Sequence, residues 1–252
     1  MPAVTRFPAA IQFALQYLDT GPASFAGRAI LAGAYLMAGQ PSQALAEADR
    51  ILQSHPAGAG ALKIKLLDRH PNDADGPYML GRIYYQEGQI DLAIGQFERA
   101  LKVNPESYES LDSPGLCYAA KGEDRKATGY FLGAIKLVEK DYPEYEWPYT
   151  NLAELLLKQG DARRAFDAAS MAANRNPASA RSFYVGAKAL EQLDKIDLSV
   201  NWTQRAAAID PGYSDAWYLI ARLYTKLGQE EKASEARQRF TSAQGKELAK
   251  RR

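Results

Sequence analysis

The chain has 252 residues, of which 46% are hydrophobic and 24% are charged, a composition typical of a globular protein with a substantial core. A net charge of +1 excludes a general attraction to nucleic acid or to an acidic membrane. Cys117 is the only cysteine, which excludes an intramolecular disulfide and a cysteine metal cluster and fits a cytoplasmic, reducing compartment. No run approaches the roughly 18 apolar residues that a membrane-spanning helix needs.

The predicted elements begin with a single helix in residues 4–24, where apolar side chains recur at helical spacing. Residues 25–58 then predict two helices joined at Gly39 and closed by Pro56. Residues 59–73 are too few for a second pair. We therefore expect one short helix there, a half repeat that interrupts the regular spacing.

Residues 74–107 carry the clearest pattern. Leu80 and Tyr84 lie on one stripe of a first helix, and Gly88 follows where that helix should end, because glycine adopts the left-handed conformation at little cost. Phe97 lies on the apolar stripe of a second helix. Pro105 then ends that helix, since proline lacks an N–H and disfavours helix in the preceding residue. The pattern predicts a helix–turn–helix unit.

The same spacing recurs to the end of the chain. Two copies depart from it: Pro114 takes the place of a large apolar residue, and Asp194 replaces the turn glycine. Because Ser113 and Pro114 together are typical of a helix start, we expect the first helix of that copy to start late or to kink. The further copies occupy residues 108–145, 146–179, 180–213 and 214–247.

This recurrence of small, aromatic and turn residues every 34 positions resembles the tetratricopeptide repeat (TPR) family. The resemblance covers nearly the whole chain. It implies an all-α fold, a right-handed TPR superhelix (α-solenoid) of about six helix–turn–helix repeats with short additional helices. It further implies one solenoid domain over residues 1–252, acting as a protein-interaction scaffold without catalysis or a cofactor.

The residues that could support catalysis have simpler structural roles. His55 and His70 both precede a proline in a slot that Asn104, Asn176 and Asp210 fill elsewhere, so they are read as polar residues at helix ends. Cys117 falls where a small apolar group packs, and nothing near it in sequence suggests a lowered pKa. We therefore expect no enzymatic activity and no metal site.

In the resembling family, certain positions of each first helix face the concave groove. Carried onto this chain, they place a tyrosine four residues before a cation, one helical turn apart, in three repeats. Such pairs offer rigid contact area and a grip on carboxylates, so we expect an acidic or C-terminal peptide as ligand. The alternative is that the tyrosines pack between repeats and the cations are solvated. The candidate groove residues are Tyr78, Arg82, Tyr85, Asn151, Tyr184, Lys188, Tyr218, Arg222 and Lys226.

Three other functions stay open at this point. The chain could be a TPR segment of a larger enzyme or of a secretion or assembly machine. RNA binding through helical repeats would predict a basic groove, and the balance of 31 basic to 30 acidic residues argues against it. Self-association through the terminal helices would bury the stripe of Phe13 and Tyr17. We expect a protein or peptide partner, with neither nucleic acid nor a membrane.

Overall fold

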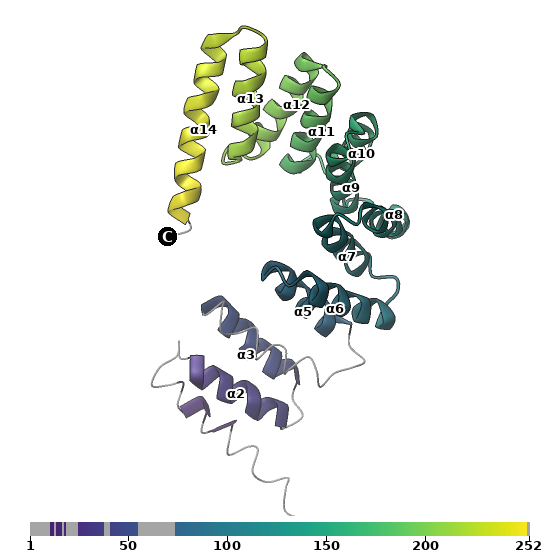
Figure 1. Cartoon of the computed structure of the whole chain (residues 1–252). Helices are drawn as coiled ribbons and strands as arrows, with labels where there is room; N and C mark the ends of the chain where they lie inside the picture. The colour runs from purple at the N-terminus through teal and green to yellow at the C-terminus, as the bar shows by residue number, and fades with distance from the viewer. Residues whose placement is uncertain are drawn as a thin grey trace, which may run out of the picture. The chain divides into compact units, whose positions relative to one another are not determined.

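The computed structural model describes residues 11–12, 14–16, 18, 25–37, 41–54 and 74–250. Within these ranges every regular element is a helix, and no strand occurs. The helices (Figure 1) are α2 (Phe25–Met37), α3 (Pro41–Ser54), α5 (Asp75–Gln86), α6 (Ile90–Val103), α7 (Tyr108–Lys121), α8 (Asp124–Asp141), α9 (Trp147–Lys158), α10 (Ala162–Arg175), α11 (Ala180–Gln192), α12 (Ile196–Ile209), α13 (Ser214–Lys226) and α14 (Glu230–Lys250).

The chain divides into two compact units, Met1–Pro105 and Glu106–Arg252. In the first unit, α2 packs on α3 and α5 packs on α6. Ala14 and Leu18, both helical, are buried against Leu31 of α2. Most of the predicted helix in residues 4–24, the predicted half repeat in residues 59–73 and both histidines lie outside the described residues.

In the second unit, α7 to α14 form four successive helix pairs, and each pair packs on the next. Figure 1 shows the pair α13 and α14 side by side, and α9 also contacts the first helices on both sides, α7 and α11. The helix pairs follow the predicted repeats, with α14 extending past residue 247 to Lys250, so the all-α repeat architecture is confirmed. A single continuous domain over the whole chain stays a prediction.

Close helix packing depends on small residues facing aromatic rings. A Cβ placed on Gly81 would lie 2.6 Å from a ring atom of Phe97, and one on Gly115 would lie 2.5 Å from Phe131. These are the small and aromatic positions that the repeat pattern predicts. The phenylalanines are almost fully buried, so each ring fills the space that the missing side chain leaves.

The turn that follows the first helix of each pair has the same backbone conformation throughout the second unit. Gly122, Gly160 and Gly228 have φ between 69° and 81°, a left-handed conformation that favours glycine. Asp194 holds the equivalent place with φ 56°. The turn is therefore kept where the glycine is replaced, because aspartate is one of the few residues that tolerate this region.

The expected late start of the helix around Pro114 is wrong. α7 begins at Tyr108, and Pro114 lies inside it. Ser107 caps the helix, since its Oγ accepts from the backbone N–H of Ser110 at 3.1 Å. Ser113 is not a cap, because its Oγ donates to the carbonyl of Glu109 at 2.8 Å. The strong cap lets the helix start before the proline.

Candidate functional site

The candidate residues of the first unit form one local pair and one exposed neighbour. The guanidinium of Arg82 lies 5.9 Å from the ring centre of Tyr78, one helical turn away on α5. The Tyr78 ring also lies 5.8 Å from that of Phe97, so it contributes to packing as well as to the surface. Tyr85 is 37% exposed.

In the second unit the expected tyrosine–cation pairs are present. Lys188 Nζ lies 5.7 Å from the ring centre of Tyr184 on α11, and the Arg222 guanidinium lies 6.0 Å from that of Tyr218 on α13. Tyr184 is partly buried, whereas Tyr218 is 54% exposed. Each contact contributes about 0.5–1 kcal/mol at such exposed sites. The two pairs belong to what we call the first-helix surface, formed by the side chains Glu154, Lys158, Arg181, Tyr184, Lys188, Glu191, Tyr218, Arg222 and Lys226.

Glu191 of α11 engages two of the candidate cations. Its carboxylate accepts from Lys226 Nζ at 2.7 Å and also from the guanidinium of Arg222, both on α13. The Glu191 side chain is only 11% exposed. The sequence analysis missed Glu191, which neutralises the cations that were expected to grip a ligand. The sequence could have suggested this contact, because Glu191 lies about one repeat before Arg222 and Lys226.

A second cross-repeat ion pair joins α9 to α11. Arg181 donates twice to Glu154, from Nε at 2.8 Å and from Nη2 at 2.6 Å. This hydrogen bonding raises the pKa of the Arg181 guanidinium. The same guanidinium lies 5.5 Å from the ring of Trp147, which is 40% exposed. Neither Arg181 nor Glu154 was among the candidate residues.

Asn151 is on the predicted face but is occupied by a partner within the chain. Its Nδ2 donates to Asp112 Oδ2 of α7 at 2.8 Å, and the two residues are 4% and 6% exposed. Burial raises the pKa of Asp112 to about 6, against the opposing effects of this hydrogen bond and of Arg181. Next to Asn151, the hydroxyls of Thr150 and Ser182 lie 2.9 Å apart and join α9 to α11.

A pocket of about 520 Å³ opens between α9 and α11 on the first-helix surface. Two lysines contribute its positive charge: Lys188, over the Tyr184 ring, and Lys158, whose Nζ donates to the carbonyl of Ala119 at 3.3 Å. Glu154 supplies negative charge but is already paired with Arg181. Both lysines line the pocket and make it a positively charged place, although the Lys158 ammonium is hydrogen-bonded to α7 in the free protein. Its lining residues are Glu154, Leu157, Lys158, Tyr184, Val185, Lys188 and Gln192.

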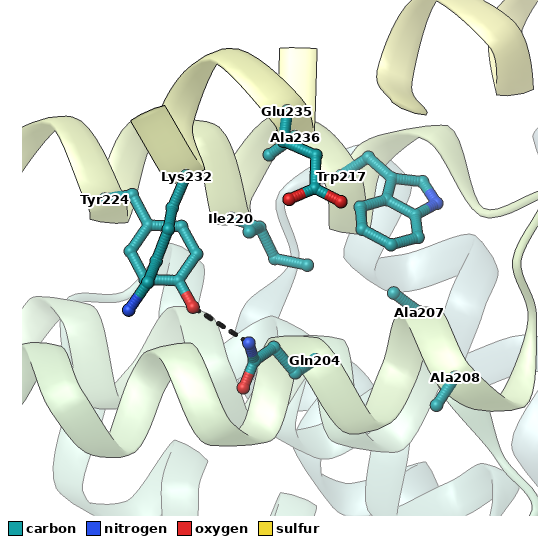
Figure 2. A pocket seen from close by; sticks show the side chains of 9 residues that line it. All are labelled: Gln204, Ala207, Ala208, Trp217, Ile220, Tyr224, Lys232, Glu235 and Ala236. Atoms are coloured by element: carbon teal, nitrogen blue, oxygen red, sulfur yellow. Dashed lines mark hydrogen bonds between the residues drawn. The ribbon is translucent and has the colours of Figure 1, made fainter. Parts of the chain in front are cut away.

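A different pocket, of about 440 Å³, lies among α12, α13 and α14 (Figure 2). Figure 2 shows the Trp217 ring at one side and Tyr224 at the other, where Gln204 Nε2 donates to the tyrosine hydroxyl at 2.9 Å. Ala207 and Ala208 come from α12. The pocket contains none of the residues proposed from the sequence.

The titratable groups of the described part of the chain do not form a metal site, since no cluster of three or more His, Cys, Asp or Glu side chains occurs there. Cys117 is fully buried, and burial raises the pKa of its thiol to about 11. A protonated, buried thiol is a poor nucleophile. Among the described residues, no helix has the length and apolar character to cross a membrane.

Comparison with known families matches the repeat pattern directly. A family described as tetratricopeptide repeat matches residues 78–142, and a second family of the same description matches residues 202–235. The chain is a tetratricopeptide repeat protein. As a TPR protein it has a fold used for protein-interaction scaffolds, in which stacked repeats present an extended binding surface.

Among curated proteins, this TPR chain is 32% identical over 110 residues to the Protein CTR9 homolog of Arabidopsis thaliana, covering 43% of the chain and 10% of that protein. It is 33% identical over 67 residues to a probable UDP-N-acetylglucosamine–peptide N-acetylglucosaminyltransferase SEC of the same plant, covering 27% of the chain and 7% of that protein. The chain thus spans a tenth or less of these relatives.

Among solved structures, MamA is 20% identical with a TM-score of 0.57, over 68% of this chain and 97% of MamA. YrrB, described as a TPR protein with an unusual peptide-binding site, is 18% identical with a TM-score of 0.53, over 73% and 92%. Yeast Tom70 is 15% identical with a TM-score of 0.60, over 97% and 59%. At these identities the likeness establishes the fold alone.

Proposed function

We propose that this TPR protein binds an acidic segment of a protein partner along the first-helix surface of its second unit, without chemistry of its own. The observation that carries the proposal is the pocket between α9 and α11, where Lys158 and Lys188 approach one opening. The nearby carboxylate of Glu154 is paired with Arg181, so it does not neutralise the positive charge of both lysines.

The neighbouring side chains suit an extended segment. Tyr184 and the exposed Tyr218 offer flat contact surfaces at low entropic cost on successive first helices. Arg222 and Lys226 would contribute long-range attraction, although Glu191 reduces it. A carboxylate of the segment, from a side chain or the C-terminus, would sit between the lysines. This proposal keeps Lys188 and the second-unit tyrosines that were expected from the sequence, and it adds Lys158.

The test uses the full chain and a phage-displayed library of random dodecapeptides as the probe. Wild type should enrich peptides with acidic residues. An enriched peptide, labelled with fluorescein, should bind Lys158→Gln/Lys188→Gln at least about tenfold more weakly, since lost charge-assisted contacts of this kind are each worth about 1.5–3 kcal/mol. Lys195→Gln, an exposed lysine of a turn, is the matched control and should bind as wild type does.

Two results would contradict the proposal. One is enrichment without any acidic preference, and the other is equal binding by the double variant and the control. Thermal unfolding of each variant would establish that a loss of binding does not reflect a loss of folding.

A second function is favoured by the length of the curated relatives. Because the chain corresponds to a tenth or less of those proteins, it could act as the TPR segment of a larger assembly. Size-exclusion chromatography of the native protein from its own cells would test this, with a complex far above 27.7 kDa as the expected result. A cytoplasmic location stays a prediction. Self-association through Phe13 and Tyr17 also stays a prediction, since both residues lie outside the described part of the chain.

A further inference from the structure

Asp112 and Asn151 form a side-chain pair that joins the first helices of two successive repeats. Asp112 lies on α7 and Asn151 on α9, 39 residues later, with 2.8 Å between Asn151 Nδ2 and Asp112 Oδ2. Both residues are more than nine-tenths buried. A carboxyl and a primary amide have matching shapes, so the pair can form two hydrogen bonds if the carboxyl carries a proton.

The other carboxyl oxygen of Asp112 and the amide oxygen of Asn151 have no hydrogen-bond partner. Asp112 Oδ1 and Asn151 Oδ1 are both buried acceptors that receive no donor. Leaving such atoms unpaired costs about 1–3 kcal/mol each, more for a charged group. The positive charge that acts on Asp112 is that of Arg181 of α11, and its guanidinium is already bound to Glu154 through two hydrogen bonds. An ionised Asp112 would therefore be a buried carboxylate with one donor.

We propose that Asp112 and Asn151 hold one proton between them and form a closed acid–amide ring across the α7–α9 junction. The proton lies on Asp112 Oδ1 and is donated to Asn151 Oδ1, while Asn151 Nδ2 donates to Asp112 Oδ2. One proton thus gives both orphan oxygens a partner. Ionisation releases this proton to solvent and leaves the two oxygens as opposed acceptors, which weakens the junction.

The groups that face Asp112 support this protonation. From α9 the facing group is the neutral amide of Asn151, and from α11 it is Arg181, whose charge is shared with Glu154. The contact from α8 is apolar: the ring of Phe131 packs against α7 at Gly115, which has no side chain. Burial thus outweighs the nearby positive charge and raises the pKa of Asp112 to about 6. The junction changes its protonation within the range that cells can reach.

The consequence is a pH-sensitive junction between two of the first helices, next to the surface that we propose for partner binding; this consequence rests on that proposed function. Asn151, which the TPR resemblance suggested as a direct contact to a bound peptide, is instead engaged by the ring in the free protein. Because the pKa of Asp112 is about 6, the ring has lost its proton in most molecules at pH 7, and α7 and α9 are then held less firmly than at pH 5.

A carboxyl ¹³C NMR titration of the full chain tests the inference, with the Asp112 resonance assigned by its loss in Asp112→Asn. We expect a titration midpoint near pH 6, about two pH units above that of an ordinary aspartate. Urea unfolding gives the second readout. Asn at position 112 can form both hydrogen bonds of the ring without a proton, so its unfolding midpoint should exceed that of wild type at pH 8 and approach it at pH 5.

Glu109→Gln, an exposed carboxylate on the same helix, is the matched control and should keep the wild-type pH profile above pH 5. A midpoint for Asp112 at or below pH 4 would overturn the inference and indicate an ionised carboxylate that receives a second donor from water. A constant stability gap between Asp112→Asn and wild type from pH 5 to pH 8 would overturn it as well. If Asp112→Asn does not fold, the Asp112 resonance is assigned instead from triple-resonance spectra of wild type, and its titration still decides.

Discussion

Substitution of Gly186 by alanine tests the close packing between a first helix and the second helix of the same repeat. A Cβ on Gly186 would lie 2.5 Å from Cε3 of Trp202 and closer still to its Cζ3. The Trp202 ring cannot easily retreat, because its centre lies 5.0 Å from that of Phe166 and 5.3 Å from that of Phe183. Ala169 Cβ, at 3.4 Å, limits movement of the new methyl group.

The expected magnitude is the difference of two effects. Overpacking a well-packed core costs about 1–3 kcal/mol, whereas alanine gains about 1 kcal/mol over glycine in a helix interior. Gly186→Ala should therefore lose up to about 2 kcal/mol of unfolding free energy. Gly129→Ala in α8, where no atom lies within 4 Å of the new Cβ, should gain about 0.5–1 kcal/mol.

Urea unfolding followed by far-UV circular dichroism measures both variants under identical conditions. A decisive addition is Gly186→Ala combined with Trp202→Phe, since the smaller ring leaves room for the methyl group. The double variant should lose less stability than the sum of the two single variants. Equal stability of Gly186→Ala and Gly129→Ala, or full additivity in the double variant, would refute the packing argument.

Four further predictions concern charge, backbone and reactivity. Because burial raises the pKa of Asp112 from 3.8 to about 6, its stabilising contribution is complete below pH 3.8 and is lost as pH rises through 6. The loss by pH 8 is about 3 kcal/mol, measured as the change with pH in the stability gap between wild type and Asp112→Asn. Asp194→Gly should raise the unfolding free energy by about 0.5 kcal/mol, because the relief of a left-handed conformation exceeds the greater flexibility of the unfolded chain. Cys117 should react with a thiol reagent at pH 8 far more slowly in native than in urea-unfolded protein, and fast native labelling would contradict its burial. Glu191→Gln frees Arg222 and should strengthen binding of an acidic library-selected peptide at low salt, as measured by fluorescence anisotropy.

The repeat architecture could be predicted from the sequence because it depends on local spacing. Leu80, Gly88 and Phe97 each lie within one helix pair, and most of the helices end next to a glycine or a proline, with Asp194 in place of the glycine after α11. The start of α7 was mispredicted because Pro114 was given more weight than the cap at Ser107. Proline inside a helix removes one backbone hydrogen bond, and a good cap with tertiary packing can offset that loss.

The candidate site was only partly predictable, for a related reason. The pairing of Tyr184 with Lys188 follows from the helical period alone, so it was found. The partners of Arg222 and Asn151 lie 31 and 39 residues away, and their contacts depend on the angle between successive repeats. Helical periodicity carries no information about that angle. Pairing each first helix with the preceding one would have suggested Glu191 as a partner.

Charge on the first-helix surface is therefore organised by contacts between repeats rather than by single helices. Glu154 and Glu191 each accept from cations of the following repeat, which fixes the spacing of the first helices and reduces the free positive charge. Lys158 and Lys188 have no carboxylate among their contacts in the described structure and meet at one pocket. A partner that brings a carboxylate there gains attraction without breaking an existing ion pair. At Arg222 the same carboxylate would have to compete with Glu191, and this difference is why we place the anion between the lysines.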